Sequence, residues 1–151
     1  VFFILLLIFN FEMVYKSYVF HPFQYNYFNN LISKNKKLLY ERDTAHLGRY
    51  YALKDIIKDI NINNSDKNII KIGSASWSPL EDVLYMFEDN DLKKFSLTGT
   101  NDLIKADYIY TNYIYELNFD YNNKYKIPKN FSLHKSVYKN DTLMYSIFKK
   151  K

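Results

Sequence analysis

The chain opens with an unbroken run of nine apolar residues, Val1–Phe9. A helix that crosses the hydrocarbon core of a bilayer needs about 20 consecutive apolar residues, so this run supplies less than half of a span. Residues 10–20 remain rich in aromatic and aliphatic side chains but include Asn10, Glu12 and Lys16. Charges are costly at the bilayer centre and tolerated near helix ends, where tyrosines are also enriched. The pattern therefore predicts a helix that ends at a membrane interface.

Three other structures compete for this run. A signal peptide would carry a basic segment before its apolar run and a small-residue cleavage site after it, and the sequence shows neither. An amphipathic helix would be apolar along one stripe, whereas Val1–Phe9 is apolar all round, and a short buried strand also fits the length. The first methionine is Met13, which favours a chain that continues from upstream. We expect residues 1–20 to be the end of the last transmembrane helix, residues 21–44 a membrane-interface connector and residues 45–151 a soluble domain.

Composition limits the kinds of partner. The chain has 151 residues, enough to bury a core, and its 19% aromatic content means that tyrosine and phenylalanine fill much of it. The net charge of +5 favours weak attraction to anionic lipid headgroups or polyphosphates. The lysines are scattered among the acids and only Arg42 and Arg49 are arginines, so we expect no nucleic-acid partner. The cluster Lys34–Lys37 favours either contact with anionic lipid or a solvated loop. The absence of cysteine excludes disulfides and cysteine-ligated metals.

Hydrophobic spacing predicts two helices and a strand in the first half of the domain. The residues that share one helical face within 46–61 are Leu47, Tyr50, Leu53, Ile57 and Ile60. Asp43 or Thr44 is the expected N-cap of this helix. Asn68–Ser74 is typical of a short buried strand. The sequence Ser78-Pro79-Leu80-Glu81 predicts a second helix that runs to about Glu88, with Ser78 and Glu81 forming a capping box.

Four further strands are expected at Lys94–Thr98, Ala106–Tyr113, Phe131–Lys139 and Thr142–Lys149. The last two form a hairpin across Lys139-Asn140-Asp141, whose residue types suit a tight turn. The first strands are expected to pair in parallel through the second helix, and the last two to pair antiparallel. This order predicts an α/β or α+β domain with a small mixed sheet of about five strands and flanking helices.

Several polar groups are candidate sites. Gly73-Ser74-Ala75-Ser76 leads from a strand toward a helix start, where backbone N–H groups bind phosphate, but it lacks the spaced glycines of nucleotide-binding loops. Trp77 beside it either stacks on a sugar or anchors the helix. Glu41 and Asp43 are paired carboxylates, for which helix capping by Asp43 is the simpler role. His134 is expected to face outward from its strand. The spacings match neither a metal site nor a hydrolase nucleophile elbow.

The segment His21-Pro22-Phe23-Gln24-Tyr25-Asn26-Tyr27-Phe28-Asn29 resembles the stretch that follows the last membrane helix in GT-C-type membrane glycosyltransferases, which are relatives of the dolichyl-phosphate-mannose protein mannosyltransferases. In that family the stretch reads His-Pro-Tyr-Gln, two residues, then Tyr-Phe-Asn. An acid, one residue and Asp-Tyr-Trp often follow. Here Glu41-Arg42-Asp43 matches the acid and the aspartate, and Thr44-Ala45 replaces the aromatic pair. The closing hairpin, residues 135–149, is similar to the family's usual ending.

The resemblance implies the C-terminal extracytoplasmic domain of an enzyme that transfers a sugar from a polyprenyl-phosphate carrier to an acceptor. The family's catalytic acids lie in its first extracytoplasmic loop, outside this sequence, so no catalytic residue, metal or cofactor is assigned here. The residues that the resemblance makes substrate-binding candidates are His21, Gln24, Tyr27, Asn29 and Asp43. Their alternative roles are packing at the helix exit for His21 and docking on the membrane unit for the others. The implied partners are the bilayer, the carrier-linked sugar and the rest of the enzyme, at the inner membrane with this domain on its periplasmic side.

Two other functions stay open. One is a membrane-anchored, non-catalytic α/β binding or interaction module. The other is a soluble enzyme with a site near Gly73–Ser78, which leaves Val1–Phe9 without a role. The reading frame before Val1 separates the first two, because a transferase needs many apolar spans and an anchor needs one.

Overall fold

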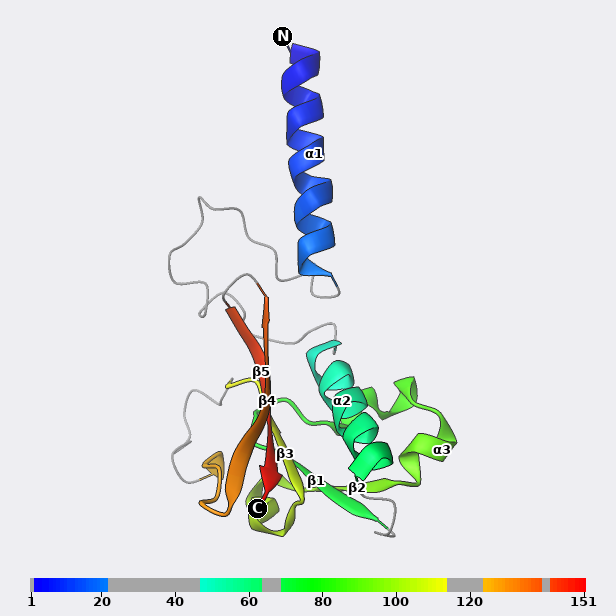
Figure 1. The fold of residues 1–151 in the computed structure, drawn as a ribbon, viewed down its shortest axis with the longest axis vertical. Helices are drawn as coiled ribbons and strands as arrows, with labels where there is room; N and C mark the ends of the chain where they lie inside the picture. Colours follow the sequence, from blue (N-terminus) through cyan, green and yellow to red (C-terminus); the bar gives the residue numbers. More distant parts are fainter. Residues whose placement is uncertain (1, 22–46, 64–68, 114–123, 140–141) are drawn as a thin grey trace.

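The structure is a computed structural model that describes residues 2–21, 47–63, 69–113, 124–139 and 142–151. In chain order, its elements are α1 (Phe2–Phe20), α2 (Leu47–Asn63), β1 (Ile70–Ser74), the 3₁₀ helix η3 (Glu81–Met86), α3 (Asp89–Leu92), β2 (Phe95–Thr98), the 3₁₀ helix η4 (Thr100–Lys105), β3 (Tyr108–Thr111), β4 (Phe131–Lys139) and β5 (Thr142–Lys150). Figure 1 shows α1 extending away from the sheet, with the carboxyl terminus at the opposite end of the molecule.

The five strands form one mixed sheet in the order β2-β1-β3-β5-β4. Strand β1 pairs in parallel with both β2 and β3, and β5 pairs antiparallel with both β3 and β4. This confirms the predicted class, an α+β domain with a five-stranded mixed sheet, a parallel start and an antiparallel closing hairpin. The chain leaves β1 toward β2 on one side and then crosses to β3 on the other, so its winding direction reverses at β1.

Helix α2 covers one face of the sheet (Figure 1). Its predicted apolar stripe is confirmed, since Leu53, Ile57 and Ile60 are buried and Leu47 and Tyr50 pack at the margin of the same core. The buried sheet residues beneath it are Ile70, Ile72, Tyr108, Tyr110, Tyr145 and Ile147. Burying an aliphatic or aromatic side chain of this size contributes roughly 1.5–3 kcal/mol, so this layer carries much of the fold's stability.

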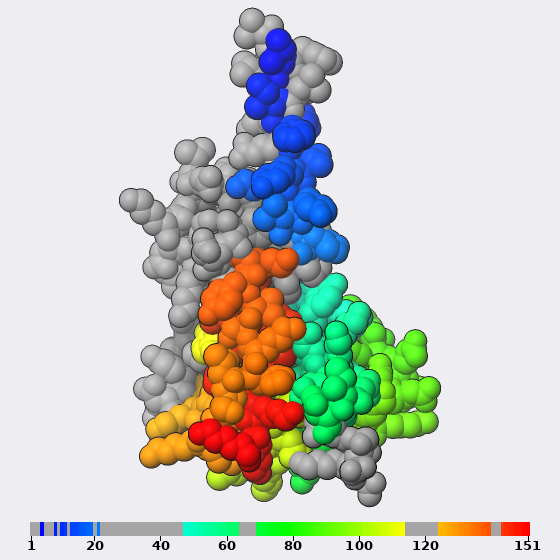
Figure 2. Space-filling view, in the orientation of Figure 1, coloured from blue at the N-terminus to red at the C-terminus, as the bar shows by residue number. Residues whose placement is uncertain are grey.

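The opposite face holds a smaller apolar cluster. Ala75, Leu103, Ala106, Ile109 and Phe131 are its buried members. Residue Leu103 belongs to η4, which is thereby held against the sheet between β2 and β3. Figure 2 shows the outer surface of the molecule, where β4 (orange) and β5 (red) lie beside α2 (cyan to green).

The predicted capping box at Ser78 and Glu81 is wrong. The helix that follows is a six-residue 3₁₀ helix, its N-cap is Leu80, and no side chain caps it. The backbone of Ser78 instead forms hydrogen bonds within the preceding loop. Its N–H donates to Ser76 Oγ at 3.3 Å, and its carbonyl accepts from Ser74 Oγ at 3.2 Å. The helix ends at Met86 rather than Glu88. The predicted caps at Asp43 and Thr44 lie outside the described residues.

Helix α1 forms over residues 2–20, but in the described ranges no helix combines the length and apolar composition needed to cross a membrane. The interpretation of residues 1–20 as the end of a transmembrane helix is therefore not shown and stays a prediction. The large apolar side chains that α1 exposes, among those described, are Ile4, Ile8, Phe11, Met13, Val14, Tyr15 and Tyr18.

Candidate functional site

The residues that the sequence singles out around 21–43 are largely outside the described part of the chain. His21 is described and exposed, and it closes the last turn of α1, with its backbone N–H donating to the Tyr18 carbonyl at 3.1 Å. Gln24, Tyr27 and Asn29 lie outside the described residues, as does Asp43. The structure therefore neither brings this group together nor separates it.

The candidate site within the sheet is the carboxyl edge of β1 and β3. In open α/β sheets, ligands bind outside the carboxyl ends of neighbouring strands where the winding direction reverses. Strands β1 and β3 are such a pair, with Ser74 of β1 opposite Tyr110 of β3. The edge comprises the loop after β1, residues 75–80, and the residues after β3, Asn112 and Tyr113.

Hydrogen bonds tie the two halves of this edge together. Ser76 Oγ donates to Asn112 Oδ1, and Thr111 Oγ1 donates to the Ala75 carbonyl at 2.7 Å. The backbone N–H of Ala75 donates to the Tyr110 carbonyl at 2.8 Å. Ser76 and Thr111 are almost completely buried. Because an unsatisfied buried polar group is costly, these bonds fix the loop in one conformation.

Tyr113 has a left-handed backbone with φ 60°. This conformation is uncommon for a bulky residue and costs roughly 1–2 kcal/mol. Its N–H donates to Thr111 Oγ1 at 3.0 Å and its hydroxyl to Ser146 Oγ at 3.2 Å, so the surroundings hold it there. Ser146 also shares a 2.8 Å hydrogen bond with Ser136 Oγ. The strained residue thus connects the carboxyl edge to the antiparallel half of the sheet.

The far end of the loop is anchored to α2 by Arg49. This guanidinium, whose side chain is 4% exposed, donates to the Pro79 carbonyl at 2.7 Å and to Asp82 Oδ2 at 2.8 Å. Burying an arginine requires such partners. Between the two anchors, Trp77 remains 41% exposed. The loop is therefore a fixed platform that presents one indole ring to solvent.

The phosphate-binding interpretation of Gly73–Ser76 loses its main support. The helix begins at Glu81, and the N–H groups of Ala75 and Ser78 are already used inside the fold. Gly73 has a packing role: a Cβ there would lie 2.9 Å from Leu103 Cδ2. Among the described residues, no three acids or histidines gather in a way that would hold a metal ion.

A second polar cluster joins α2 to the strands and is not evident from the sequence. Asp59 Oδ2 accepts from Lys149 Nζ at 2.7 Å and from the Tyr108 hydroxyl, and Asp59 Oδ1 accepts from Asn63 Nδ2 at 2.7 Å. One turn earlier, Asp55 Oδ2 accepts from Lys135 Nζ at 2.6 Å and from the Tyr145 hydroxyl at 2.9 Å. The i,i+4 spacing of the two aspartates was the available signal, but their partners on the strands lie about 50 to 90 residues away.

The hydrogen bonds of this cluster favour the charged forms of Asp59 and Lys149. Burial alone would raise the pKa of Asp59, but the hydrogen bonds from Lys149, Tyr108 and Asn63 outweigh it and hold that pKa below its ordinary value. Burial alone would lower the pKa of Lys149, and its bonds to Asp59 and Tyr108 raise it instead. Burial, and then the charge of Asp55, raises the pKa of the Tyr145 phenol well above its ordinary range.

His134 is exposed, as predicted, and it lies on the side of the sheet that α2 covers. Its Nε2 lies 3.7 Å from Asp59 Oδ1, and its ring packs edge-on against Tyr108 with centroids 6.2 Å apart. The register of β4 against β5 shifts between Leu133 and Lys135, and this bulge breaks the simple alternation of faces. His134 and Lys135 therefore both reach the side of the sheet that α2 covers.

Comparisons with known proteins add no relative: no protein-family model, no curated protein and no solved structure matches this chain.

Proposed function

We propose that this chain is the C-terminal soluble part of an integral-membrane glycosyltransferase that transfers a sugar from a polyprenyl-phosphate carrier to an acceptor. The observation that carries the proposal is the continuity of the apolar helix α1 with the His21–Asn29 segment and then with an α+β domain. In this proposal the catalytic acids belong to a part of the enzyme outside this chain. The domain lies on the extracytoplasmic side, covers the active site and helps to select the acceptor.

The surface of α1 supports its placement in a bilayer. Successive residues of a helix are about 100° apart, so Ile4, Ile8 and Phe11 share one side and Met13 lies on the other. All four are more than half exposed. A helix with apolar residues on opposite sides favours a lipid environment over packing on one protein face.

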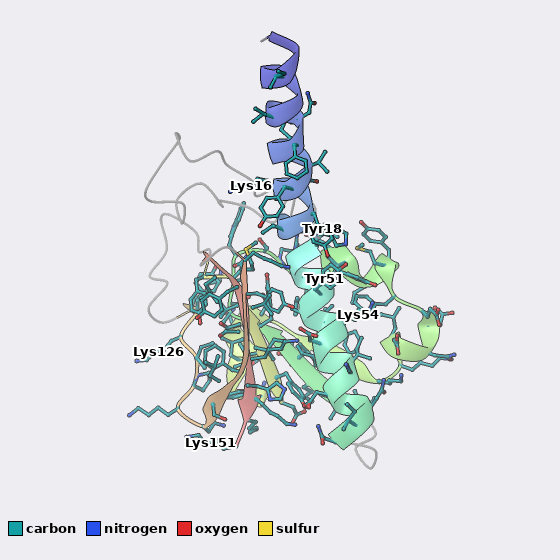
Figure 3. All side chains as sticks on the ribbon, turned by 45° about the horizontal axis from the view of Figure 1, so that its top comes forward. Lys16, Tyr18, Tyr51, Lys54, Lys126 and Lys151 are labelled. Atoms are coloured by element: carbon teal, nitrogen blue, oxygen red, sulfur yellow. The ribbon has the colours of Figure 1, made fainter. Side chains whose placement is uncertain are left out.

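The carboxyl end of α1 supports a membrane interface at that end. Tyr15, Lys16 and Tyr18 lie in its last two turns, and both tyrosines are exposed. Tyrosine rings are enriched at the level of the lipid headgroups, and a lysine there extends its ammonium group to water. Figure 3 shows Lys16 and Tyr18 on the part of α1 that is nearer to the domain. In this proposal His21, three residues after Tyr18, binds a carrier phosphate at the headgroup level.

Membrane insertion of α1 is tested by flotation of the full chain with lipid vesicles. Ile8→Glu replaces an apolar group worth roughly 1.5–3 kcal/mol in a lipid environment with a charge, so vesicle partitioning falls at least about tenfold. Ile62→Glu is the matched control, because Ile62 on α2 is 69% exposed and Ile8 is 61% exposed. Equal vesicle partitioning of the two variants would show that α1 does not insert into the membrane and would contradict the proposal.

The transfer reaction is tested on membranes that contain the whole gene product. The measurement is the movement of radiolabelled sugar from a polyprenyl-phosphate donor to an acceptor. We expect His21→Ala to lower transfer by about tenfold or more, as expected for the loss of a charge-assisted bond to a phosphate. His134→Ala is the control histidine, because it contacts α2 and Tyr108 rather than the end of α1. Sugar transfer at the wild-type rate by the His21→Ala variant would show that His21 does not bind the carrier.

A non-catalytic, membrane-anchored module is the second candidate. It is favoured by the carboxyl edge of β1 and β3, where the hydroxyls of Ser74, Ser76 and Thr111 all donate to groups inside the fold. Hydroxyls used in this way position a loop rather than attack a substrate. Vesicle binding without any sugar transfer by the whole gene product would select this candidate.

A further inference from the structure

We propose that the edge of the domain farthest from α1 is a docking surface for a linear, phosphate-bearing polymer. This proposal goes beyond sugar transfer, and it is carried by the placement of lysines that are far apart in the sequence. The lysines concerned, called the lysine edge below, are Lys71, Lys93, Lys126, Lys129, Lys150 and Lys151.

Backbone hydrogen bonds bring the lysine edge together along one end of the sheet. The Ile70 N–H donates to the Lys94 carbonyl at 3.0 Å, which places Lys93 beside the start of β1. Asp107 then links two strands, since its N–H donates to the Lys71 carbonyl at 2.7 Å and its carbonyl accepts from the Lys150 N–H at 2.9 Å.

The row continues to the last strand of the sheet. The Lys151 N–H donates to the Asn130 carbonyl at 3.0 Å, which brings the end of the chain beside Lys129 and the start of β4. Figure 3 places Lys126 and Lys151 at the same end of the molecule, away from Lys16 and Tyr18. The lysine edge therefore crosses the whole sheet, from β2 to β4.

The Asp107 carboxylate lies at this edge and its Oδ2 accepts from the Lys71 N–H at 3.0 Å, so the positive charge of the lysine edge is compensated only in part. All six side chains are exposed, and none forms an ion pair with a described acid. Two neighbouring lysines differ, because Lys94 pairs with Asp91 at 2.7 Å and Lys105 pairs with Asp102 at 3.0 Å. Like charges at this density repel one another and attract anions from solution.

The geometry favours an extended polyanion over a small anion. Five strands about 4.8 Å apart spread the lysines over roughly 19 Å, so they do not converge on a single phosphate. Lysine ammonium groups are compact and rotatable, so they follow an irregular phosphate backbone. The row contains no arginine, and the exposed aromatic residues Trp77, Tyr85 and Tyr138 belong to other elements. It therefore lacks the stacking groups that single-stranded nucleic acids use.

The orientation of the molecule argues against a membrane as the partner. Figure 1 shows the end of β5 and the carboxyl terminus at the opposite end of the molecule from α1. With α1 in a bilayer, the lysine edge faces away from that bilayer. A soluble or surface-bound polymer that carries a negatively charged phosphate in each repeat matches this position and charge.

The test is calorimetric titration of the full chain, in nonionic detergent, with linear inorganic polyphosphate at several salt concentrations. Each phosphate contact on a flexible chain contributes about 0.7 to the slope of log K against log salt. Lys71→Gln with Lys150→Gln removes two contacts, so we expect at least tenfold weaker binding and a slope smaller by about 1.4. Lys54→Gln with Lys58→Gln is the matched control, because both are exposed lysines on α2. We expect this control to change affinity by less than about threefold.

Three results would overturn the proposal. Equal weakening by the two double variants would mean that net charge alone attracts the polymer. Tighter binding of single-stranded DNA than of polyphosphate of equal charge would show base contacts. Loss of binding to phosphatidylglycerol vesicles by the edge variant, with polyphosphate binding intact, would make a membrane the partner. Circular dichroism melting of each variant, unchanged within a few degrees, confirms that folding is not the cause.

Discussion

Replacing Asp59 by asparagine removes one negative charge from the contact between α2 and the sheet while keeping the shape of the side chain. The carboxylate is 12% exposed and accepts hydrogen bonds from Lys149, Tyr108 and Asn63. These donors come from three different elements, so the substitution tests how much of the packing of α2 depends on one ionised group. His134 at 3.7 Å adds a fourth polar neighbour.

The expected loss of stability is about 2 kcal/mol. A hydrogen bond to a charged group contributes about 1.5–3 kcal/mol, and Lys149 belongs at the low end because its side chain is 31% exposed. The Tyr108 hydroxyl keeps an acceptor in the amide, but a neutral acceptor is weaker by roughly 0.5–1 kcal/mol. For a chain of this length, the total corresponds to a melting temperature lower by about 4–8 °C.

The loss depends on pH in a defined direction. The pKa of Asp59 is lowered in the folded state, so the carboxylate stabilises the fold fully above its unfolded pKa of about 3.9. That contribution disappears as the pH falls through the lower, folded pKa. The difference in stability between the wild type and the variant is therefore present at pH 7 and shrinks toward zero in strong acid.

Urea unfolding, followed by the fluorescence of the single tryptophan Trp77, measures this difference. Asp91→Asn is the control, because Asp91 pairs with Lys94 and both side chains are about one third exposed. Such surface pairs contribute about 0.5 kcal/mol or less. The reasoning is refuted if Asp59→Asn is as mild as this control, or if its effect does not shrink as the pH falls.

Two further predictions concern packing and alkaline pH. Gly73→Ala places a Cβ 2.9 Å from Leu103 Cδ2, and we expect it to destabilise the fold by about 1–2 kcal/mol in thermal melts. Gly99→Ala, with nothing within 4 Å of the added Cβ, stays within about 0.5 kcal/mol of the wild type, and equal effects would contradict the packing argument. The folded pKa values of Tyr145 and Lys149 are both raised, so stability falls as the pH rises above about 10, where the unfolded chain loses these protons first. Urea midpoints at pH 8 and pH 10.5 measure this fall, and a higher midpoint at pH 10.5 would contradict it.

Local patterns predicted most of the elements. The apolar stripe of α2 follows the helical period, and the turn residues Lys139-Asn140-Asp141 mark the hairpin of β4 and β5, so these patterns locate the three elements within a few residues. The short run before Gly73 predicted the strand β1, because the run is apolar and is bounded by polar residues. The mixed pairing followed from connection lengths, since a hairpin forces antiparallel strands and the connection from β1 to β2 allows parallel ones.

The errors have physical causes that single-sequence patterns do not contain. Ser78 has the residue type of a helix cap, but the tertiary contacts of its loop with Ser74 and Ser76 use its backbone first. The sequence pattern also does not show the β-bulge between Leu133 and Lys135, which brings Lys135 to the same side of the sheet as His134.

The candidate sites were the hardest to predict, because they depend on long-range contacts. Arg49 is buried by bonds to Pro79 and Asp82, which lie about 30 residues away. The lysine edge assembles from residues whose spacing carries no pattern in the sequence. The group from His21 to Asp43 lies mostly outside the described residues, so its proposed role still rests on the resemblance.

The most direct test of the central claim is the reading frame upstream of Val1. A lipid-carrier glycosyltransferase predicts several apolar segments of about 20 residues each before this chain, with a pair of acidic residues in the loop after the first of them. A stop codon, or a single apolar segment with its own start codon, would contradict the claim and leave a membrane-anchored module without sugar transfer.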